Sequence, residues 1–355
     1  AGLYAQEAIA ELDEDLSLLC LGTYPIPGRM MRRMLEHVSR VMVIEELEPV
    51  VEEQVKMLAR TANPGLEILG KEDCIPRQGE LDLLTVRNAI ARLMKRPERL
   101  PAKGPDARIL PPRPPSLCPG CSHRATYFAM KKAFGKNAIF PSDIGCYTMA
   151  VNMGTVDTCL CMGADITMAQ GLHRVEPNRK HIAFIGDSTF FHTGIPGIIN
   201  AVYNETDITV IILDNSTTAM TGHQPHPGTG RTMMGNMTEK LHIDQVLAGC
   251  NVKCIKKANP LQLEEAVAAV TEAVAFPGVS VVIFEEPCIA LFKSRPKLQV
   301  DAAKCVGCRR CVQEIGCPAI SLTAAGKALI DENLCYGCDL CSQLCPTGAI
   351  GGSKK

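Results

Sequence analysis

The sequence lacks the features that mark several large classes of protein. It has no apolar run of about 18 residues, which excludes a membrane-spanning helix. The formal net charge is −1 and like charges form no long run, so nucleic acid and anionic membranes are poor candidates as partners. The first residues, Ala1–Tyr4, show neither a methionine nor the basic-then-apolar pattern of a signal peptide. We therefore expect a cytoplasmic protein, and we expect an N-terminal portion to be missing or to lie on another chain.

Tryptophan is absent as well, whereas cysteine is abundant. The chain of 355 residues contains 18 cysteines, and eight of them lie between Cys305 and Cys345. In a chain without an export signal, this usage favours metal ligation or redox clusters over disulfides. The length predicts two or three domains, and a hydrophobic content of 46% is sufficient for packed cores.

Patterns along the chain predict two α/β domains and a smaller third region. The first hundred residues alternate strand-like runs with segments of helical spacing, in the order 16–21, 27–38, 40–44 and 50–58. Seven prolines between residues 97 and 115 predict a linker. The second α/β domain follows, with buried-type strands at residues 181–185, 208–213 and 280–285.

Residues 297–355 contain an internal repeat, in which VDAAKCVGCRRC is echoed by IDENLCYGCDLC thirty residues later. Each copy has a CxxCxxC run, which wraps three thiolates around one face of a four-iron cluster, and in two-cluster ferredoxins the fourth ligand comes from the other copy. The predicted ligand sets are Cys305, Cys308, Cys311 and Cys345 for cluster one, and Cys335, Cys338, Cys341 and Cys317 for cluster two. The first copy departs from the usual spacing, with five residues between Cys311 and Cys317. Zinc or a disulfide knot is the alternative.

Polar residues follow two buried strands of the second α/β domain. Residues 186–188 (GDS) follow one strand, and residues 214–217 (DNST) follow the other. A diphosphate binds amides at such a turn, and Mg²⁺ prefers oxygen ligands, here Asp187, Asn215 and the backbone carbonyl of Thr217. Ligands of α/β proteins bind at the carboxyl ends of adjacent strands, where these residues are expected to lie. The alternative is an ordinary turn in which Asp187 caps a helix.

This pattern is similar to the thiamine diphosphate signature, GDG followed by NN, from which it departs at Ser188 and Asp214. Three flanking elements, CPGC at 118–121, SDIGC at 142–146 and EPC at 286–288, resemble the thiamine-binding domain of 2-oxoacid:ferredoxin oxidoreductases in the same order. The resemblance implies a third four-iron cluster near the thiamine, ligated by Cys118, Cys121, Cys146 and Cys288. The alternative is that Cys146 and Cys288 are buried thiols and that the CPGC element binds zinc or nothing.

Residues 187–194 (DSTFFHTG) and 218–227 (TAMTGHQPHP) resemble the indolepyruvate:ferredoxin oxidoreductase alpha-subunit family. The fold class that this implies is α/β, with two doubly wound α/β domains followed by a small two-cluster ferredoxin-like domain. The implied parts are a transketolase C-terminal-like domain at 1–98, a Pro-rich linker at 99–116, a thiamine diphosphate-binding domain at 117–296 and the ferredoxin-like domain at 297–355. The pyrimidine-binding domain, with the glutamate that activates the cofactor, would precede Ala1.

The resemblance further implies an activity and partners. The activity is oxidative decarboxylation of arylpyruvates to aryl-acetyl-CoA with thiamine diphosphate and Mg²⁺, and the iron–sulfur clusters pass the electrons to ferredoxin. Coenzyme A would take the acyl group, and a smaller beta subunit would complete a hetero-oligomer. Another 2-oxoacid:ferredoxin oxidoreductase, acting on pyruvate or a branched-chain oxo acid, and an electron-transfer subunit that binds no thiamine are the two alternatives.

The same resemblance implies the residues of the thiamine site. The cofactor-binding residues would be Gly145, Cys146, Gly186, Asp187, Ser188, Asn215, Thr217, Met220 and Thr221. His192 and His223 flank the diphosphate site and are candidates to transfer a proton or to position the substrate carboxylate, and His226 is a weaker candidate. The alternative for all three is hydrogen bonding behind the site or loop packing.

Overall fold

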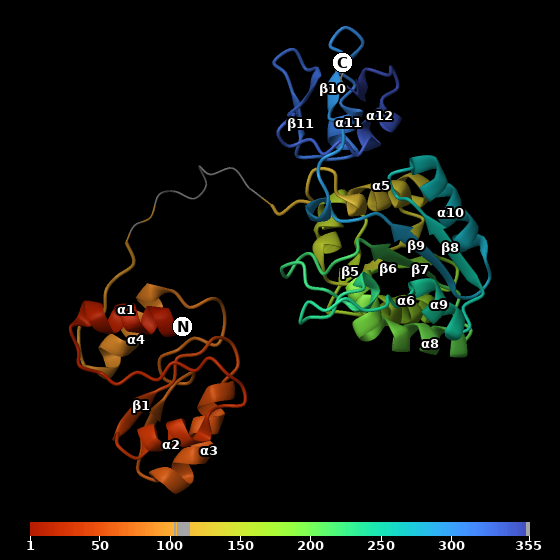
Figure 1. The fold of residues 1–355 in the computed structure, drawn as a ribbon. Coiled ribbons are helices and arrows are strands. Elements are labelled where there is room, and N and C mark those ends of the chain that lie inside the picture. Colours follow the sequence, from red (N-terminus) through yellow and green to blue (C-terminus); the bar gives the residue numbers. More distant parts are fainter. Residues whose placement is uncertain (103, 105–113, 353–355) are drawn as a thin grey trace. The chain divides into compact units, whose positions relative to one another are not determined.

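The computed structural model describes residues 1–102, 104 and 114–352, and the chain divides into two compact units, residues 1–112 and 113–355 (Figure 1). Each unit is described by itself. Residues 103 and 105–113 of the predicted linker lie outside the described residues. Within the described part, no helix is long and apolar enough to cross a membrane.

The first unit has a narrow parallel sheet with helices on both faces. Its elements are α1 (Gly2–Leu12), α2 (Gly28–Leu35), β1 (Arg40–Met42), α3 (Val50–Ala62), β2 (Glu67–Leu69) and α4 (Leu83–Leu93). β1 pairs with β2, and Val41 lies opposite Ile68. Val41 packs into a core with α2 and α3, whereas the next residue, Met42, packs into a second core with α1 and α4. The alternation of side chains along a strand thus sends neighbours to opposite faces.

The strand predicted at residues 16–21 is not present. Within the described residues, no backbone–backbone hydrogen bond involves residues 15–21. A strand is defined by the ladder it forms with a neighbour, and no neighbouring strand pairs with this segment in the described residues. The prediction was wrong for this reason. The other three predicted elements of the unit are present as α2, β1 and α3.

The second unit contains one large parallel sheet in its described residues, with strand order β5-β4-β6-β7-β9-β8 and β3 beside β6. The strands are β3 (Ala138–Ile139), β4 (Pro141–Ser142), β5 (Thr158–Cys159), β6 (Lys180–Gly186), β7 (Thr209–Asp214), β8 (Cys254–Ala258) and β9 (Ser280–Glu285). β6 and β7 are buried on both faces, which explains their nearly continuous apolar sequences.

Helices cover both faces of this sheet, so the predicted doubly wound α/β architecture is confirmed for the second unit. The helices are α5 (Ser122–Phe134), α6 (Ala164–Val175), α7 (Asp187–Thr189), α8 (Ile195–Tyr203), α9 (Ile243–Gly249) and α10 (Leu263–Ala275). α5 and α10 pack on one face, and α6, α8 and α9 pack on the other (Figure 1). A 3-10 helix, η2 (Cys146–Met153), follows β4, and a π-helical turn at Phe190–Gly194 joins α7 to α8.

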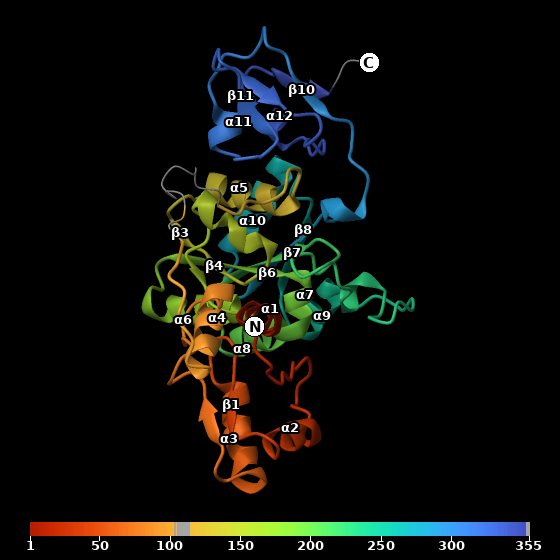
Figure 2. The same cartoon turned by 90° about the vertical axis from the view of Figure 1, so that its left-hand side faces the viewer.

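The cysteine-rich tail is a small domain of two antiparallel strand pairs, β10–β13 and β11–β12. Its elements are β10 (Leu298–Val300), α11 (Arg310–Gln313), β11 (Ile320–Leu322), β12 (Ala328–Ile330), α12 (Leu340–Leu344) and β13 (Ile350–Gly352). The tail lies against the side of the second unit formed by α5 and α10 (Figures 1 and 2). Gln343 of α12 accepts a hydrogen bond from the Leu263 amide at 2.9 Å and donates one to the Leu261 carbonyl at 2.7 Å.

Candidate functional site

Asp187 connects the carboxyl ends of β6 and β7 by hydrogen bonds. These two strands pair with each other, and Gly186 lies opposite Leu213. Its Oδ2 accepts hydrogen bonds from the amides of Asn215 at 3.1 Å and Ser216 at 2.8 Å. Its Oδ1 accepts one from the Ser188 amide at 2.8 Å. The carboxylate is buried. Because it accepts hydrogen bonds from both polar turns that follow these strands, the two turns lie side by side.

The second turn adds further oxygen atoms next to Asp187. Asn215 and Thr217 are buried, and Asn215 Oδ1 accepts a hydrogen bond from the Thr217 amide at 3.3 Å. Burial, and then the neighbouring charge of Asp187, raise the pKa of Asp214 to about 6. Two carboxylates that repel each other in a buried turn, beside an amide oxygen, form a donor set that suits a divalent cation with oxygen ligands.

His226 and His123 complete the surroundings of this donor set. His226 Nε2 lies 3.2 Å from Asp187 Oδ2 and is buried without a hydrogen bond. His123 Nε2 lies 3.3 Å from Asn215 Nδ2, and burial lowers the pKa of His123 to about 4, so this imidazole is neutral. The unsatisfied His226 nitrogen is an observation of the structure that fits a further polar group at this site.

The side chain of Tyr147 packs directly against the backbone of Gly145 and Gly186. A Cβ at Gly145 would come within 2.6 Å of the tyrosine Cζ, and one at Gly186 within 2.8 Å of its Cε1. The Tyr147 hydroxyl donates to Asp143, and burial together with that acid raises the pKa of Tyr147 well above its usual range. The absent side chains of the two glycines therefore make room for the ring, and they keep the backbone accessible at the turn.

Sequence reasoning missed His123, Asp143 and Tyr147. All three lie within or next to the CPGC and SDIGC elements, and their proximity to those elements was the available signal. What the sequence did not provide was the fold of the sheet, which brings His123 at the start of α5 to Asn215 after β7.

The remaining predicted thiamine-site residues lie at the rim. His192 is exposed on the π-helical turn, and His223 is exposed with a φ of 62°. Met220 is half exposed, and the Thr221 hydroxyl donates to Gln224 Oε1 at 2.7 Å. Ser188 Oγ accepts a hydrogen bond from the Thr218 hydroxyl at 2.8 Å. The structure therefore places His226 at Asp187, and it places the two histidines that the sequence favoured on the outer surface.

The four cysteines predicted for the third cluster converge from three parts of the fold. Burial, followed by the Cys118 and Cys288 thiolates, raises the pKa of Cys146. Burial raises the pKa of Cys121 to about 12, and the Cys118 thiolate adds to this. The Cys288 amide donates to the Asn215 carbonyl at 2.9 Å, so this cysteine set borders the turn that carries Asp187 and Asn215.

The tail brings its cysteines together in two crossed sets. Burial raises the pKa of Cys311, and the thiolates of Cys308, Cys305 and Cys345 raise it further. The same four cysteines line one cavity. Burial raises the pKa of Cys341, and the thiolates of Cys338, Cys317 and Cys335 raise it further. The amide of Gly337 donates to Cys335 Sγ at 3.4 Å, and that of Ala349 donates to Cys345 Sγ at 3.2 Å.

These cysteine sets fit multi-iron clusters in their chemistry. Each gathers four thiols whose mutual charge and burial oppose ionisation, and bound metal cations remove that cost by coordinating the thiolates. Within the described residues, no three His, Cys, Asp or Glu side chains are arranged tightly enough around a single point to hold one metal ion.

The set formed by Cys118, Cys121, Cys146 and Cys288 lies against the loop of the second tail set. Gly120 of the CPGC element has a φ of 78°, and a Cβ there would come within 2.5 Å of the Tyr336 Cβ. Tyr336 stands between Cys335 and Gly337, and its carbonyl accepts a hydrogen bond from the Arg295 amide at 3.1 Å. The CPGC loop and the second cluster loop are therefore in direct contact.

Comparisons with known families agree with this arrangement. Residues 143–284 match the model of the thiamine pyrophosphate enzyme C-terminal TPP-binding domain, and residues 328–351 match the 4Fe-4S binding domain. The second unit is thus an α/β thiamine pyrophosphate enzyme domain that carries a ferredoxin-like tail.

Nearly the whole chain is similar to one kind of curated protein, the indolepyruvate oxidoreductase subunit IorA. The Pyrococcus horikoshii protein is 40% identical over 98% of this chain and 58% of its own length. The Methanothermobacter thermautotrophicus protein is 38% identical over 99% of this chain and 58% of its own length. The chain therefore spans a little under three fifths of these relatives. A 2-oxoglutarate:ferredoxin oxidoreductase from Magnetococcus marinus is 18% identical, with a TM-score of 0.44 over 50% of this chain and 66% of its own.

Proposed function

We propose that this chain is the thiamine-binding and electron-transfer part of an enzyme that oxidatively decarboxylates arylpyruvates to aryl-acetyl-CoA. The supporting observation is a continuous connection within the second unit. The Cys288 amide bonds to Asn215 in the metal turn, and Gly120 of the same cysteine set packs on Tyr336 in the second tail set. A site that removes electrons from a substrate one at a time needs such an arrangement.

Asp187, Asn215 and the Thr217 carbonyl hold Mg²⁺ in this proposal, and the backbone at Gly186 and Ser188 faces the diphosphate. The reasons are the buried carboxylate of Asp187 and the close approach that Gly186 permits. Thiamine diphosphate, when bound, supplies the electron sink for decarboxylation. Gly145, Cys146, Met220 and Thr221 line the remaining approach to the cofactor.

His226 lies beside Asp187, with its Nε2 3.2 Å from the carboxylate, where it is available to a polar group of the bound cofactor. His192 and His223 are exposed near the same turns, where each is available to exchange a proton or to meet the carboxylate of an incoming 2-oxo acid. Neither needs to leave a hydrogen-bonded core to do so.

Cys118, Cys121, Cys146 and Cys288 would hold the cluster nearest the thiamine, and the second and first tail sets would hold two further clusters, so the three together would supply a path for one-electron transfer. Ferredoxin accepts the electrons at the tail in the cytoplasm. Coenzyme A takes the acyl group, and a smaller beta subunit completes the hetero-oligomer.

Iron and acid-labile sulfide, measured on anaerobically purified protein, test this route first. Three four-iron clusters predict about twelve irons per chain. About eight irons would mean that the thiamine domain holds no cluster, and an electron-transfer subunit without thiamine would then be the better assignment.

A panel of pyruvate, branched-chain and aryl 2-oxo acids, assayed on the full-length protein with its partner subunit, tests the substrate class. Preference for pyruvate or a branched-chain oxo acid would contradict the arylpyruvate proposal.

Magnesium-dependent thiamine binding is tested with Asp187→Ala in the full-length protein. Isothermal titration calorimetry should show at least a 100-fold loss of affinity, on the order of 3 kcal/mol, because the buried oxygen ligand is removed. Asp207→Ala, which removes a half-buried carboxylate paired with Lys180, is the matched control and should bind normally. An unchanged affinity in Asp187→Ala would rule out the assigned metal site.

A further inference from the structure

Asn215 is the proposed metal ligand whose donor atom depends on how its side chain is turned. The Asp187 carboxylate presents an oxygen at both ends, whereas the side-chain amide of Asn215 has an oxygen at one end and an NH₂ group at the other. Turning the amide over exchanges the two, and an NH₂ group cannot bind Mg²⁺, which takes oxygen ligands. The metal site therefore needs a feature that holds this amide in one orientation.

His123 meets the nitrogen end of the amide. Asn215 Nδ2 lies 3.3 Å from His123 Nε2, and both residues are buried. Because Nδ2 has only hydrogens to offer, it donates, and His123 Nε2 accepts with its lone pair. With the amide turned over, Oδ1 would face this lone pair, and two buried acceptors would be left without a donor. The imidazole in this tautomer thus favours the orientation in which Nδ2 points toward it.

The other polar atoms of Asn215 agree with this orientation. Its Oδ1 accepts a hydrogen bond from the Thr217 amide at 3.3 Å, where an NH₂ group would meet a second donor. Its backbone amide donates to Asp187 Oδ2 at 3.1 Å, and its carbonyl accepts from the Cys288 amide at 2.9 Å. An amide oxygen accepts two hydrogen bonds, so Oδ1 keeps one position for a cation while the NH₂ group faces His123.

The imidazole of His123 is itself held in place by packing. His123 is the second residue of α5 and is 3% exposed. It packs edge-to-face with Tyr147, with the ring centroids 5.6 Å apart and the ring planes at 82°. The Tyr147 hydroxyl donates to Asp143, which restricts the tyrosine in turn. The ring that faces Asn215 is therefore fixed by a buried neighbour.

We propose that His123 is a positioning residue, which keeps the Asn215 amide turned so that Oδ1 rather than Nδ2 is available to Mg²⁺. The inference rests on the proposed function, in which Asn215 is a metal ligand. His123 touches neither the metal nor the cofactor in this role, and it acts through Asn215 alone. Removing a partner that orients a metal ligand in this way lowers metal affinity by about 10- to 100-fold.

Two substitutions at His123 separate hydrogen bonding from packing in the full-length protein. His123→Leu keeps most of the side-chain volume and removes the acceptor, whereas His123→Gln can place Oε1 near the position of Nε2. Isothermal titration calorimetry of thiamine diphosphate with Mg²⁺ should show on the order of a 10-fold loss of affinity for His123→Leu and less than about a 3-fold loss for His123→Gln. Equal losses in the two variants would overturn the proposal, because His123 would then only fill space.

His181→Leu is the matched control. This buried histidine lies at the opposite end of β6 from Asp187, so its replacement should leave thiamine diphosphate binding unchanged. An unchanged affinity in His123→Leu, alongside a loss in Asp187→Ala, would overturn this inference and leave the proposed metal site in place. If the wild-type protein bound no thiamine diphosphate, the proposed function would fail and this inference with it.

Asn215→Asp tests the orientation directly. The two oxygens of a carboxylate are equivalent, so this variant offers Mg²⁺ an oxygen whichever way the side chain is turned. In this background the further change His123→Leu should alter the affinity for thiamine diphosphate by less than about 2-fold, against on the order of 10-fold with Asn215 present. A loss as large as with Asn215 present would overturn the proposal, since turning of the side chain could not then be its cause.

Discussion

The tail and the thiamine domain assemble their cysteines in opposite ways. Each tail set takes three cysteines from seven consecutive residues and a fourth from the other repeat. The set in the thiamine domain combines Cys118, Cys121 and Cys146 with Cys288, which lies 170 residues after the first. Local backbone geometry determines the first arrangement, and the parallel sheet determines the second.

The tail repeats one local backbone conformation. Gly307 and Arg309 have φ values of 68° and 60°, and the equivalent residues Gly337 and Asp339 have 69° and 63°. Left-handed backbone at a residue other than glycine is uncommon, so its recurrence at Arg309 and Asp339 shows that the two CxxCxxC runs share one local conformation. The regular spacing from which these ligands are predicted therefore coincides with one repeated local conformation, whereas the ligand assignment itself stays a prediction.

Deleting one ligand from each kind of set gives the largest expected effect. Of about twelve irons per chain, Cys317→Ala should lose the roughly four bound by the second tail set and keep those of the first tail set. Cys288→Ala should lose the roughly four bound in the thiamine domain and keep all the iron of the tail. Iron analysis with electron paramagnetic resonance of the reduced protein distinguishes the two losses. Cys250→Ala, outside all three sets, is the control. If Cys317→Ala instead removed the first tail cluster, the crossed assignment would be wrong.

Arg124 connects the two regions, and its removal should have the next largest effect. This buried guanidinium donates to the carbonyls of Ile315 at 3.0 Å, Gly316 at 2.7 Å and Leu117. Ile315 and Gly316 lie in the longer gap of the first repeat, so the extra residues dock the tail on α5. Arg124→Met should lower the free energy of unfolding by about 3 kcal/mol, because it leaves buried carbonyls unpaired.

Anaerobic chemical denaturation measures this loss. Arg174→Met, at an exposed arginine of α6, is the matched control and should change stability by less than about 0.5 kcal/mol. A similarly small change for Arg124→Met would show that the longer gap plays no part in docking.

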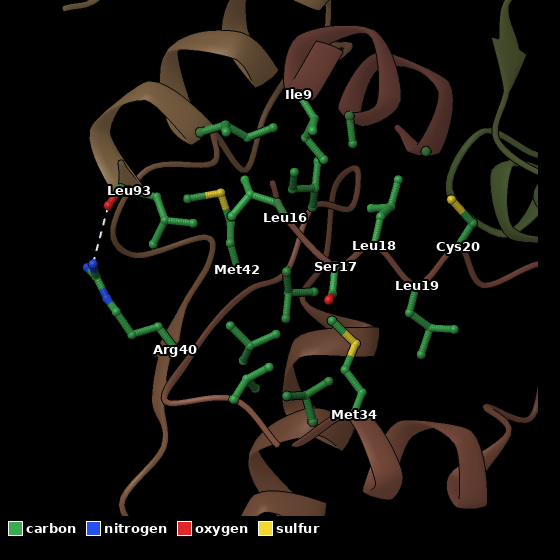
Figure 3. A pocket seen from close by; sticks show the side chains of 18 of the residues that line it. Ile9, Leu16, Ser17, Leu18, Leu19, Cys20, Met34, Arg40, Met42 and Leu93 are labelled. Atoms are coloured by element: carbon green, nitrogen blue, oxygen red, sulfur yellow. Dashed lines mark hydrogen bonds between the residues drawn. The ribbon is translucent and has the colours of Figure 1, made fainter. Parts of the chain in front are cut away.

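The same division explains how much could be predicted from the sequence. Asp187 and Asn215 were identified because each directly follows an apolar strand, and the sheet brings such ends together. The position of His226 at Asp187 depends on the path of the long loop after β7, which no short pattern specifies. The segment 16–21 has a strand-like sequence, yet it pairs with no strand in the part of the chain that the structure describes, because pairing needs a neighbour that a local pattern does not contain. The side chains of this segment instead line a cavity in the first unit (Figure 3).

Gly120 tests the contact between the two regions with a smaller change. Gly120→Ala places a Cβ within 2.5 Å of the Tyr336 Cβ in a left-handed conformation, and we expect a loss of about 2 kcal/mol. Gly348→Ala has a similar φ of 60° with no atom within 4 Å of the new Cβ, so it reports the backbone strain alone, about 1 kcal/mol. Chemical denaturation measures the free energy of unfolding of both variants. Equal losses of stability would mean that the contact between the CPGC loop and Tyr336 does not contribute to stability.

The smallest expected effect belongs to Asp214, whose pKa is raised to about 6 by burial and by Asp187. In the unfolded chain the carboxyl ionises near pH 3.9. Because ionisation is harder in the folded state, Asp214 lowers stability progressively as the pH rises from about 4 to about 6, and the full penalty persists above that range. Asp214→Asn removes the penalty, so the metal-free variant should gain about 1 kcal/mol over the wild type at pH 7.5 and less at pH 5, after allowance for partial solvent screening. Saturating Mg²⁺ should abolish this gain, because a cation at Asp187 favours the ionised carboxylate. A gain that is independent of pH would show that it does not arise from the ionisation of Asp214 beside Asp187.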